Sequence, residues 1–258
     1  MLTFYRFLQV FAVLATAAVI YACKVYVLPL WYIPIPLGVY LLVVGYGAYF
    51  IHSGLFVKAV IRGNTKEPKI AITFDDGPHP EHTPALLKIL KEHNVKATFF
   101  CIGERIEENL DLMKRISEEG HIVGNHSWAH GFWFDLQSAH NMQIELNKTN
   151  HIVQQHTGLL PHFFRPPYGV TNPNLAKAIK NTNMVAIGWS LRSMDTVIKD
   201  ERKLLGRITK SARAGDIVLF HDTQSGTVSA LPAFLKHCKE QGLEIVPLDK
   251  LINKTAYE

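Results

Sequence analysis

The sequence is poor in several features that mark particular classes of protein, and their scarcity excludes those classes. Its three cysteines, Cys23, Cys101 and Cys238, are odd in number and widely spaced, which argues against a disulfide framework or a zinc knuckle. Only 19% of its residues are charged, too few for a nucleic-acid-binding arm or a disordered tail. Internal repeats and low-complexity tracts are also missing. A chain of 258 residues then accommodates one large domain or two modest ones.

Charge is scarcest in the first fifty residues, which hold two long apolar runs. The first, residues 7–22, is interrupted only by Gln9 and Thr16, and extended to residue 28 it exceeds the roughly 20 residues that span a bilayer. The second, residues 33–51, carries no formal charge and has aromatic residues where an interface belt would lie. We therefore predict that residues 1–52 form a membrane anchor of two transmembrane helices. The alternative is a secretory signal peptide followed by a core helix.

After a predicted linker at residues 53–67, short strands and helices alternate through residues 68–258. Repeated βα units imply a parallel sheet, which forms either a barrel or an open doubly wound fold. Polar residues follow strand after strand, and active sites of βα barrels are built from loops at that face, whereas an open sheet gathers its ligands at one switch point. The residues in question are Asp75, Asp76, His126, His130, Arg165, Asp195 and His221. The pattern therefore favours a barrel.

Two adjacent carboxylates end the first of these strands. Neighbouring side chains inside a strand point to opposite faces, so Asp75 and Asp76 can reach one pocket only where the strand gives way to the Gly77-Pro78 turn. There they suit two roles, for instance one metal ligand and one general base. The alternative is an ordinary solvated Asp-Gly turn.

A second cluster strengthens the first. His126 and His130 are four residues apart, which predicts two imidazoles on one face of a helical turn. Two histidines and one carboxylate make a three-ligand metal site with room for water, which is typical of a catalytic rather than a structural metal.

At this point the sequence resembles the polysaccharide deacetylase family, whose catalytic part is the NodB homology domain of carbohydrate esterase family 4. Four of its motifs occur in the family's order: residues 73–78 (TFDDGP), 126–130 (HSxxH), 165–169 (RPPYG) and 219–222 (LFHD). The resemblance covers roughly residues 68–252. It implies an α/β fold, an incomplete (β/α)7 barrel.

The resemblance also implies roles for individual residues. Asp76, His126 and His130 would bind a divalent metal ion, and Asp75 would be the general base. Arg165 would pair with Asp75 and keep it ionised, the backbone amide of Tyr168 would contribute to an oxyanion hole, and His221 would be the general acid. Zinc is the expected metal, although histidine and aspartate also suit cobalt, nickel or iron.

The fourth motif departs from the family pattern. Many members carry an aspartate three residues before an Asp-Trp pair, and it polarises the acidic histidine. Here Arg192 occupies that position and Thr196 replaces the tryptophan. Asp195 remains, and it orients either His221 or Arg165. Trp189 is equally well a pocket wall or a core residue.

The combined prediction is a membrane-bound enzyme that hydrolyses the N-acetyl (or N-formyl) amide of an amino sugar in a polysaccharide or lipid-linked saccharide. Two other classes stay open: a catalytically inactive carbohydrate-binding barrel, and an Fe(II) oxygenase, whose metal site also uses two histidines and a carboxylate. The aromatic residues Phe132, Trp133 and Phe134 are either a sugar platform or packing beneath a loop.

Basic residues favour the cytoplasmic side when they lie within about 15–20 residues of a membrane span. Four of them follow the second apolar run (Lys58, Arg62, Lys66 and Lys69), whereas only Lys24 lies near the turn between the runs. The sequence therefore predicts a multi-pass protein of the cell membrane with its catalytic domain on the cytoplasmic face. Against this, many members of the family act outside the cell on wall polymers.

Overall fold

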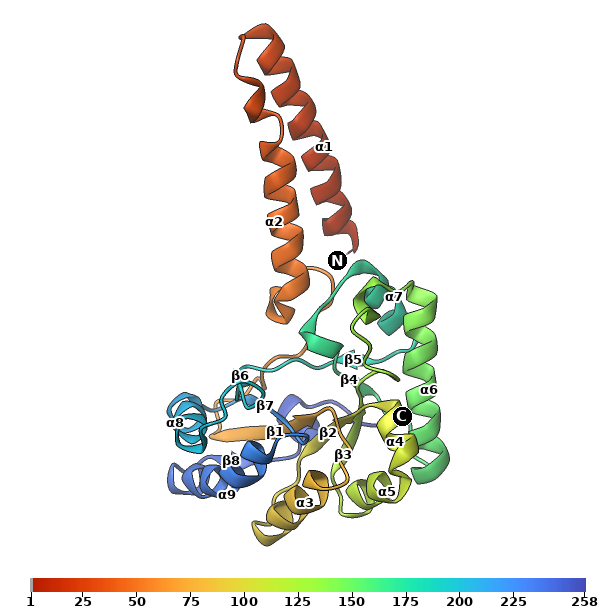
Figure 1. Ribbon diagram of the computed structural model, residues 1–258, viewed down its shortest axis with the longest axis vertical. Coiled ribbons are helices and arrows are strands. Elements are labelled where there is room, and N and C mark those ends of the chain that lie inside the picture. Colours follow the sequence, from red (N-terminus) through yellow and green to blue (C-terminus); the bar gives the residue numbers. More distant parts are fainter. Residues whose placement is uncertain (1) are drawn as a thin grey trace.

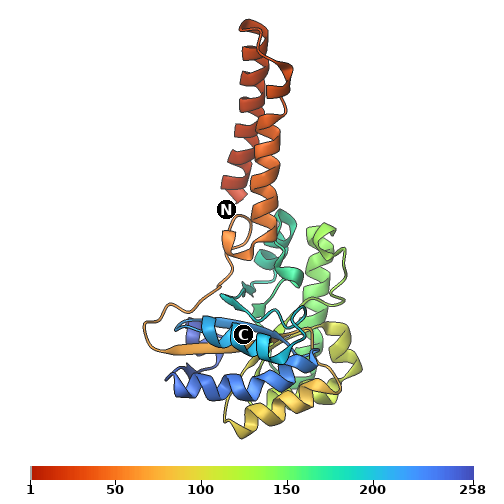
Figure 2. The same cartoon turned by 60° about the vertical axis from the view of Figure 1, so that its left-hand side comes forward.

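The protein consists of a long helical hairpin that projects from one side of an α/β domain (Figure 1). The structure is a computed structural model that describes residues 2–258. Helices α1 (Leu2–Val25) and α2 (Ile35–Tyr49) run side by side and return the chain to the domain (Figure 2). Both helical segments are long and apolar enough to cross a membrane, and only 6% of the most apolar part of each is buried within the protein. Helix α1 ends at Val25, shortly before Pro29, because proline cannot continue a helix.

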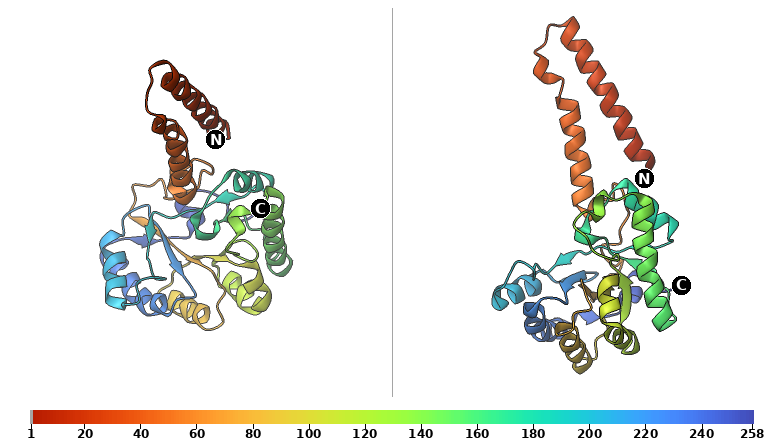
Figure 3. Two further views of the ribbon diagram at one scale, coloured as in Figure 1. Left: turned by 45° about the horizontal axis from the view of Figure 1, so that its top comes forward. Right: turned by 45° about the vertical axis from the view of Figure 1, so that its right-hand side comes forward.

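The α/β domain is built on one parallel sheet, so the predicted incomplete barrel is confirmed (Figure 3). Seven strands pair in the order β5-β4-β3-β2-β1-β7-β6, and an eighth pairs with the start of β1. The strands are β1 (Lys69–Asp75), β2 (Thr98–Cys101), β3 (Ile122–Asn125), β4 (Phe163–Phe164), β5 (Val185–Ala186), β6 (Leu191–Arg192), β7 (Ile217–His221) and β8 (Glu244–Ile245).

The ring of strands stays open between β5 and β6. Part of that gap is occupied by the segment that leads from the hairpin into β1. Val60 forms a parallel bridge with Ile187, just beyond β5, and Arg62 pairs with Asp216, whose Oδ1 lies 2.6 Å away.

Helices lie between the strands. The connection from β2 to β3 holds two helices, α4 (Gly103–Glu108) and α5 (Leu110–Glu118), which meet at Asn109. The sequence pattern did not reveal β6 or the last helix, since both are too short to show a period. The remaining helices are α3 (His82–Glu92), α6 (Ala139–Thr157), α7 (Pro173–Asn181), α8 (Glu201–Ser211), α9 (Ser225–Glu240) and α10 (Leu248–Ile252).

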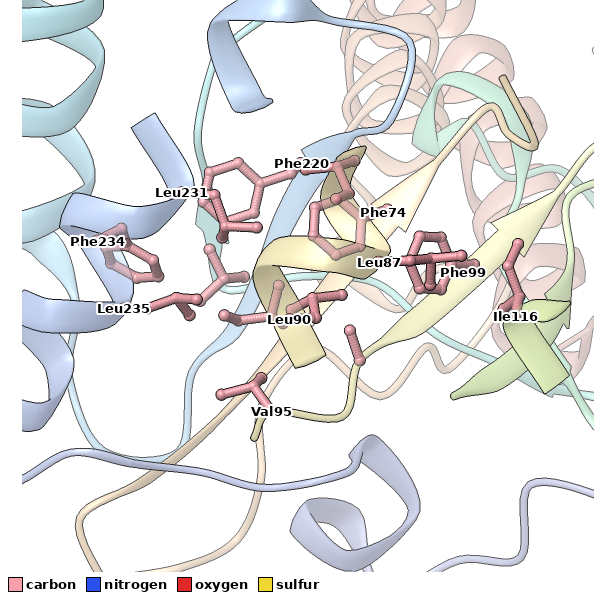
Figure 4. Packing of buried hydrophobic residues seen from close by; sticks show 14 of the residues in the cluster. Phe74, Leu87, Leu90, Val95, Phe99, Ile116, Phe220, Leu231, Phe234 and Leu235 are labelled. Carbon is pink, nitrogen blue, oxygen red and sulfur yellow. The ribbon is translucent and has the colours of Figure 1, made fainter. Parts of the chain in front are cut away.

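Strand β1 organises the core. Six of its seven residues are buried, and their side chains alternate between two faces. Phe74 stacks between Phe99 of β2 and Phe220 of β7, at centroid distances of 4.9 and 5.9 Å, over leucines of α3 (Figure 4). Thr73 and Asp75 point to the opposite face, which is the inside of the sheet's curve. Packing of Phe74 thus fixes the direction in which Asp75 points.

The segment after the hairpin packs closely on the domain. Phe56 and Val57 are buried in a cluster with Phe134 and Phe164. The end of α2 is also held, because the backbone N–H of Thr171 donates to the carbonyl of Ala48 at 2.9 Å. The division into an anchor at residues 1–52, a linker at 53–67 and a catalytic domain at 68–258 stays a prediction, but residues 56–57 contribute to the folded core.

Candidate active site

Asp75 and Asp76 diverge at the end of β1, as the sequence predicted for a strand that gives way to a turn. Asp75 is the last residue of the strand and is buried. Asp76 has a left-handed backbone (φ 76°), which turns its side chain away from that of Asp75. The Asp75 carboxylate lies against Arg165, whereas that of Asp76 lies against His126 and His130.

The two histidines follow β3 but do not lie on a helical turn, so that part of the prediction was wrong. The segment is a loop in which Ser127 and His130 both have left-handed backbones, at φ 63° and 49°. The Oδ1 atom of Asn125 accepts from the N–H of Ser127, and the Ser127 hydroxyl accepts from the N–H of His130. These local bonds take the place of a helical turn and still direct both imidazoles to Asp76.

Asp76, His126 and His130 form a cluster that can hold a metal ion. Their ligand atoms all lie within 4.8 Å of one another, and Oδ1 of Asp76 is 3.4 Å from Nε2 of His126 and 3.5 Å from Nε2 of His130. Two imidazole nitrogens and one carboxylate oxygen are a common donor set for a catalytic divalent ion.

Their hydrogen bonds and charges fit that use. Nδ1 of His126 lies 2.7 Å from the carbonyl of Arg165, which orients the ring so that Nε2 faces the cluster. Burial, together with the field of His126, lowers the pKa of His130 to about 4, so this imidazole is neutral at neutral pH. Burial would raise the pKa of Asp76, but the hydrogen bond and charge of His126 hold it well below its ordinary value. A neutral imidazole and an ionised carboxylate are the forms that bind metal.

Arg165 is the most deeply buried charged group of the site. It follows β4, its side chain is fully enclosed, and its Nη1 donates to Oδ1 of Asp75 at 2.7 Å and to the hydroxyl of Thr73 at 2.8 Å. Nη2 donates to the carbonyl of Gly188 at 2.8 Å, and the guanidinium lies over the ring of Phe100. The ion pair orients the Asp75 carboxylate, and the other contacts hold the guanidinium in place.

Asp195 contacts His221 and not Arg165, which decides between the two partners that the sequence left open. Its Oδ1 lies 2.7 Å from Nδ1 of His221, and its Oδ2 accepts from the backbone N–H of His221 at 2.7 Å and from the hydroxyl of Thr227 at 2.6 Å. Burial alone would lower the pKa of His221, but the hydrogen bond and charge of Asp195 raise it above its ordinary value. His221 therefore keeps a proton to higher pH than a free imidazole.

Asp75, Asp76, His126, His130 and His221 line one cavity of about 230 Å³. Trp189 lies in its wall and packs on Gly169, where a Cβ would come 2.4 Å from the indole, so it is a pocket residue. Tyr168 sits on the rim with a left-handed backbone (φ 56°), and its hydroxyl approaches the carbonyl of His130 at 3.5 Å. Within residues 2–258, no hydrogen bond uses the backbone N–H of Tyr168.

Several residues that shape the site were not identified from the sequence. Thr73 could have been, because it lies two positions before Asp75 and so shares its face of β1. Thr227 gave no such signal, since it reaches Asp195 from α9. Asp222 is fully buried beneath Gly77, and its Oδ2 accepts from the hydroxyl of Thr83 at 2.6 Å.

The aromatic loop after His130 has two parts. Phe134 is buried in the core, whereas Phe132 and Trp133 are 73% and 66% exposed. Side-chain amides of Asn172 and Asn174 donate to the carbonyls of Asp135 and Gln137, which ties this loop to the segment that contacts the end of α2.

Comparison with known proteins identifies relatives of this chain. The family model described as polysaccharide deacetylase matches residues 62–187. The chain is 38% identical, over 78% of its length, to the peptidoglycan-N-acetylglucosamine deacetylase PgdA of Listeria monocytogenes, and covers 42% of that protein.

Solved structures are similar as well. A peptidoglycan N-acetylglucosamine deacetylase, Bc1960, superposes with a TM-score of 0.72 at 30% identity, over 77% of this chain and 94% of the other. A pseudoenzyme of carbohydrate esterase family 4 from Bacillus anthracis superposes with a TM-score of 0.71 at 30% identity, over 77% and 71% of the two chains. The sequence identity, the coverage and the shared fold together show that this chain belongs to the polysaccharide deacetylase family.

Proposed function

We propose that this protein is a metal-dependent hydrolase that removes the N-acetyl group from an amino sugar of a glycan. The observation that carries the proposal is the meeting of three kinds of group on one small cavity. They are the Asp76-His126-His130 cluster, a buried carboxylate held by Arg165, and an imidazole held by Asp195. The activities named for its relatives support the same reaction class.

Each group has a task in amide hydrolysis. Asp76, His126 and His130 would hold a divalent ion, which would supply Lewis-acid chemistry to the amide carbonyl and to water. Asp75 accepts the proton of the attacking water as a bond forms between the water oxygen and the carbonyl carbon. The N–H of Tyr168 is available to the carbonyl oxygen as negative charge develops there. His221 gives a proton to the sugar nitrogen as the carbon–nitrogen bond breaks, so that acetate and a free amine leave.

The contacts around Asp75 and His221 prepare them for these tasks. Nη1 of Arg165 binds Oδ1 of Asp75 and so orients the carboxylate that is to accept the proton. Asp195 holds the Nδ1 proton of His221, which leaves Nε2 for the leaving nitrogen. Asp75 and His221 are also neighbours across the β1–β7 pair, in register, and this brings base and acid to the same scissile bond.

The two alternatives from the sequence are less well supported. A catalytically inactive barrel, such as the pseudoenzyme among the structural relatives, would be expected to have lost a ligand, the base or the acid, and all are present here. An Fe(II) oxygenase has no evident use for Asp75, Arg165 and His221 around its metal. Hydrolysis uses every one of them.

The test is acetate release from N-acetylglucosamine oligomers by the purified full chain. We expect release with added zinc, loss after treatment with a chelator, and recovery when zinc, cobalt, nickel or iron is returned one at a time. The Asp75→Asn variant serves as a control for contaminating deacetylases. Release that the chelator does not affect, or that Asp75→Asn retains, would contradict the proposal.

We further propose that α1 and α2 anchor the enzyme in a membrane. Their outward surfaces are apolar, with exposed side chains such as Phe7, Phe11, Val13, Leu41 and Leu42. Exposed aromatic side chains gather where α2 meets the domain (Tyr46, Tyr49 and Phe50), as expected for residues at the membrane–water interface. The side of the membrane stays a prediction. The basic residues after α2 favour the cytoplasmic face, whereas wall-polymer substrates like those named for the relatives favour the outside.

A further inference from the structure

The most unusual residue of the catalytic cavity is Arg192. It belongs to the two-residue strand β6, where successive side chains point to opposite faces. Leu191 is buried in the main core, so Arg192 points the other way and lines the cavity with Leu219, its register partner on β7, and with His221.

The guanidinium of Arg192 has no negative partner. Within residues 2–258 its side chain forms no ion pair and no hydrogen bond to the protein, and it is exposed. Both acidic groups that line the cavity already have partners, since Asp75 binds Arg165 and Asp76 lies between two histidines. Asp195, behind the cavity wall, binds His221 and Thr227. The cavity therefore presents one uncompensated positive charge at its rim.

The Arg192 side chain lies beside the catalytic groups rather than among them. Its Cζ atom is 5.9 Å from the ring centroid of Trp189, which lines the same cavity. Its main chain is fixed by β7 on one side and, on the other, by Arg207, whose Nε donates to the Arg192 carbonyl at 3.2 Å. A planar guanidinium whose backbone is held in place suits two-point binding of a carboxylate or a phosphate.

We propose that Arg192 is an anion-binding subsite that selects N-acylated amino sugars carrying an acidic substituent next to the scissile amide. This rests on the proposed deacetylase function and names its substrate class. The acidic group is a carboxylate, as in the lactyl ether of N-acetylmuramic acid, or a phosphate ester, as in a lipid-linked sugar. A neutral N-acetylglucosamine oligomer carries no negative charge to pair with this guanidinium.

The experiment compares three substrates of the metal-loaded full chain in detergent. They are a neutral N-acetylglucosamine oligomer, an oligomer that alternates N-acetylglucosamine with N-acetylmuramic acid, and an alkyl phosphodiester of N-acetylglucosamine. We expect Arg192→Gln to raise KM for at least one acidic substrate by about tenfold or more while kcat changes little, because a charge-assisted contact is lost. Activity on the neutral oligomer should change less than about twofold.

Two further variants sharpen the comparison. Arg192→Lys should restore part of the affinity, since it keeps the charge and loses the two-point geometry. Arg202→Gln removes the same charge from an exposed arginine on α8 that does not line the cavity, and it should leave all three substrates unaffected. Which acidic substrate responds to Arg192→Gln distinguishes the carboxylate from the phosphate.

The outcomes separate the two proposals. Equal losses on acidic and neutral substrates, or no loss on any, would overturn the role of Arg192 and leave the deacetylase intact. Failure of the wild-type protein to release acetate from any of the three would overturn the deacetylase proposal and this inference with it.

Discussion

Oδ1 of Asp195 lies 2.7 Å from Nδ1 of His221, while Oδ2 of the same carboxylate accepts the backbone N–H of His221 at 2.7 Å. One aspartate thus holds both the ring and the main chain of the proposed acid. Arg192 stands where the resemblance implied a polarising aspartate, and in this structure Asp195 lies beside His221.

This pairing predicts a pH effect. Asp195 raises the pKa of His221, so the protonated acid persists to higher pH than it otherwise would. Asp195→Asn removes the charge, and the alkaline limb of kcat should move to lower pH, with a loss of about 10- to 100-fold near pH 9 and a smaller loss near pH 6. Measuring kcat against pH for both proteins tests this. An alkaline limb that does not move would show that another group controls it.

Substitutions of the two carboxylates at the end of β1 should differ in their effects on metal binding and turnover. We expect Asp75→Asn to keep bound metal and to lose nearly all turnover, because it removes only the base. Asp76→Asn and His126→Ala should lose metal as well as activity. Metal content per chain, measured beside the rate, gives the answer. A metal-free Asp75→Asn protein would mean that our division of roles is wrong.

Replacement of the acid itself should slow the chemistry and spare binding. For His221→Ala we expect kcat to fall by about 10²–10⁴ with little change in KM. An N-acetyl substrate with a far better leaving group needs less protonation and should recover part of the rate. If His221→Ala were nearly as active as the wild type on both substrates, His221 would have no part in the mechanism.

Gly77 should tolerate no side chain. A Cβ at this position would lie 1.8 Å from Oδ2 of Asp222, which is fully buried and bound to Thr83. Gly77→Ala should therefore destabilise the fold by about 1–3 kcal/mol. Gly131→Ala is the matched control, because a Cβ there meets nothing within 4 Å. Thermal unfolding of the two variants compares them directly, and equal melting temperatures would refute the packing argument.

One introduced cysteine can determine on which side of the membrane the α/β domain lies. Lys66 is exposed, whereas Cys23, Cys101 and Cys238 are buried and should react poorly. In cells expressing Lys66→Cys, a membrane-impermeant thiol reagent should label the protein only after permeabilisation if the domain is cytoplasmic. Labelling of intact cells would place it outside and favour wall polysaccharide as the substrate. Wild-type protein reports the background.

Much of the fold was predictable because its signals are local. The first fifty residues, which carry little charge, predicted the hairpin, and the alternation of strands and helices with polar residues after the strands predicted the barrel. Strand β6 was not predictable, since two residues cannot display a period of two. Its place is set by pairing with β7, a contact between distant parts of the chain.

The site, like the fold, has features that the sequence predicts and features that it does not. The structure brings Asp75, Asp76, His126, His130 and His221 to one cavity, as the motifs suggested, and their roles stay predictions. The path of the loop between the histidines depends on hydrogen bonds from Asn125 and Ser127, and the setting of Asp195 depends on Thr227 from a remote helix. The spacing of residues along the chain does not predict such hydrogen-bond partners.

The contact between Thr171 and the end of α2 has a mechanical consequence. The carbonyls of a helix's last turn have no partner within the helix, and here a residue of the catalytic domain binds two of them, those of Gly47 and Ala48. The same residue lies three positions after Tyr168, on the rim of the cavity. The end of α2 is therefore attached directly to the domain. In the proposed anchored state this contact would hold the cavity at a set height above the lipid.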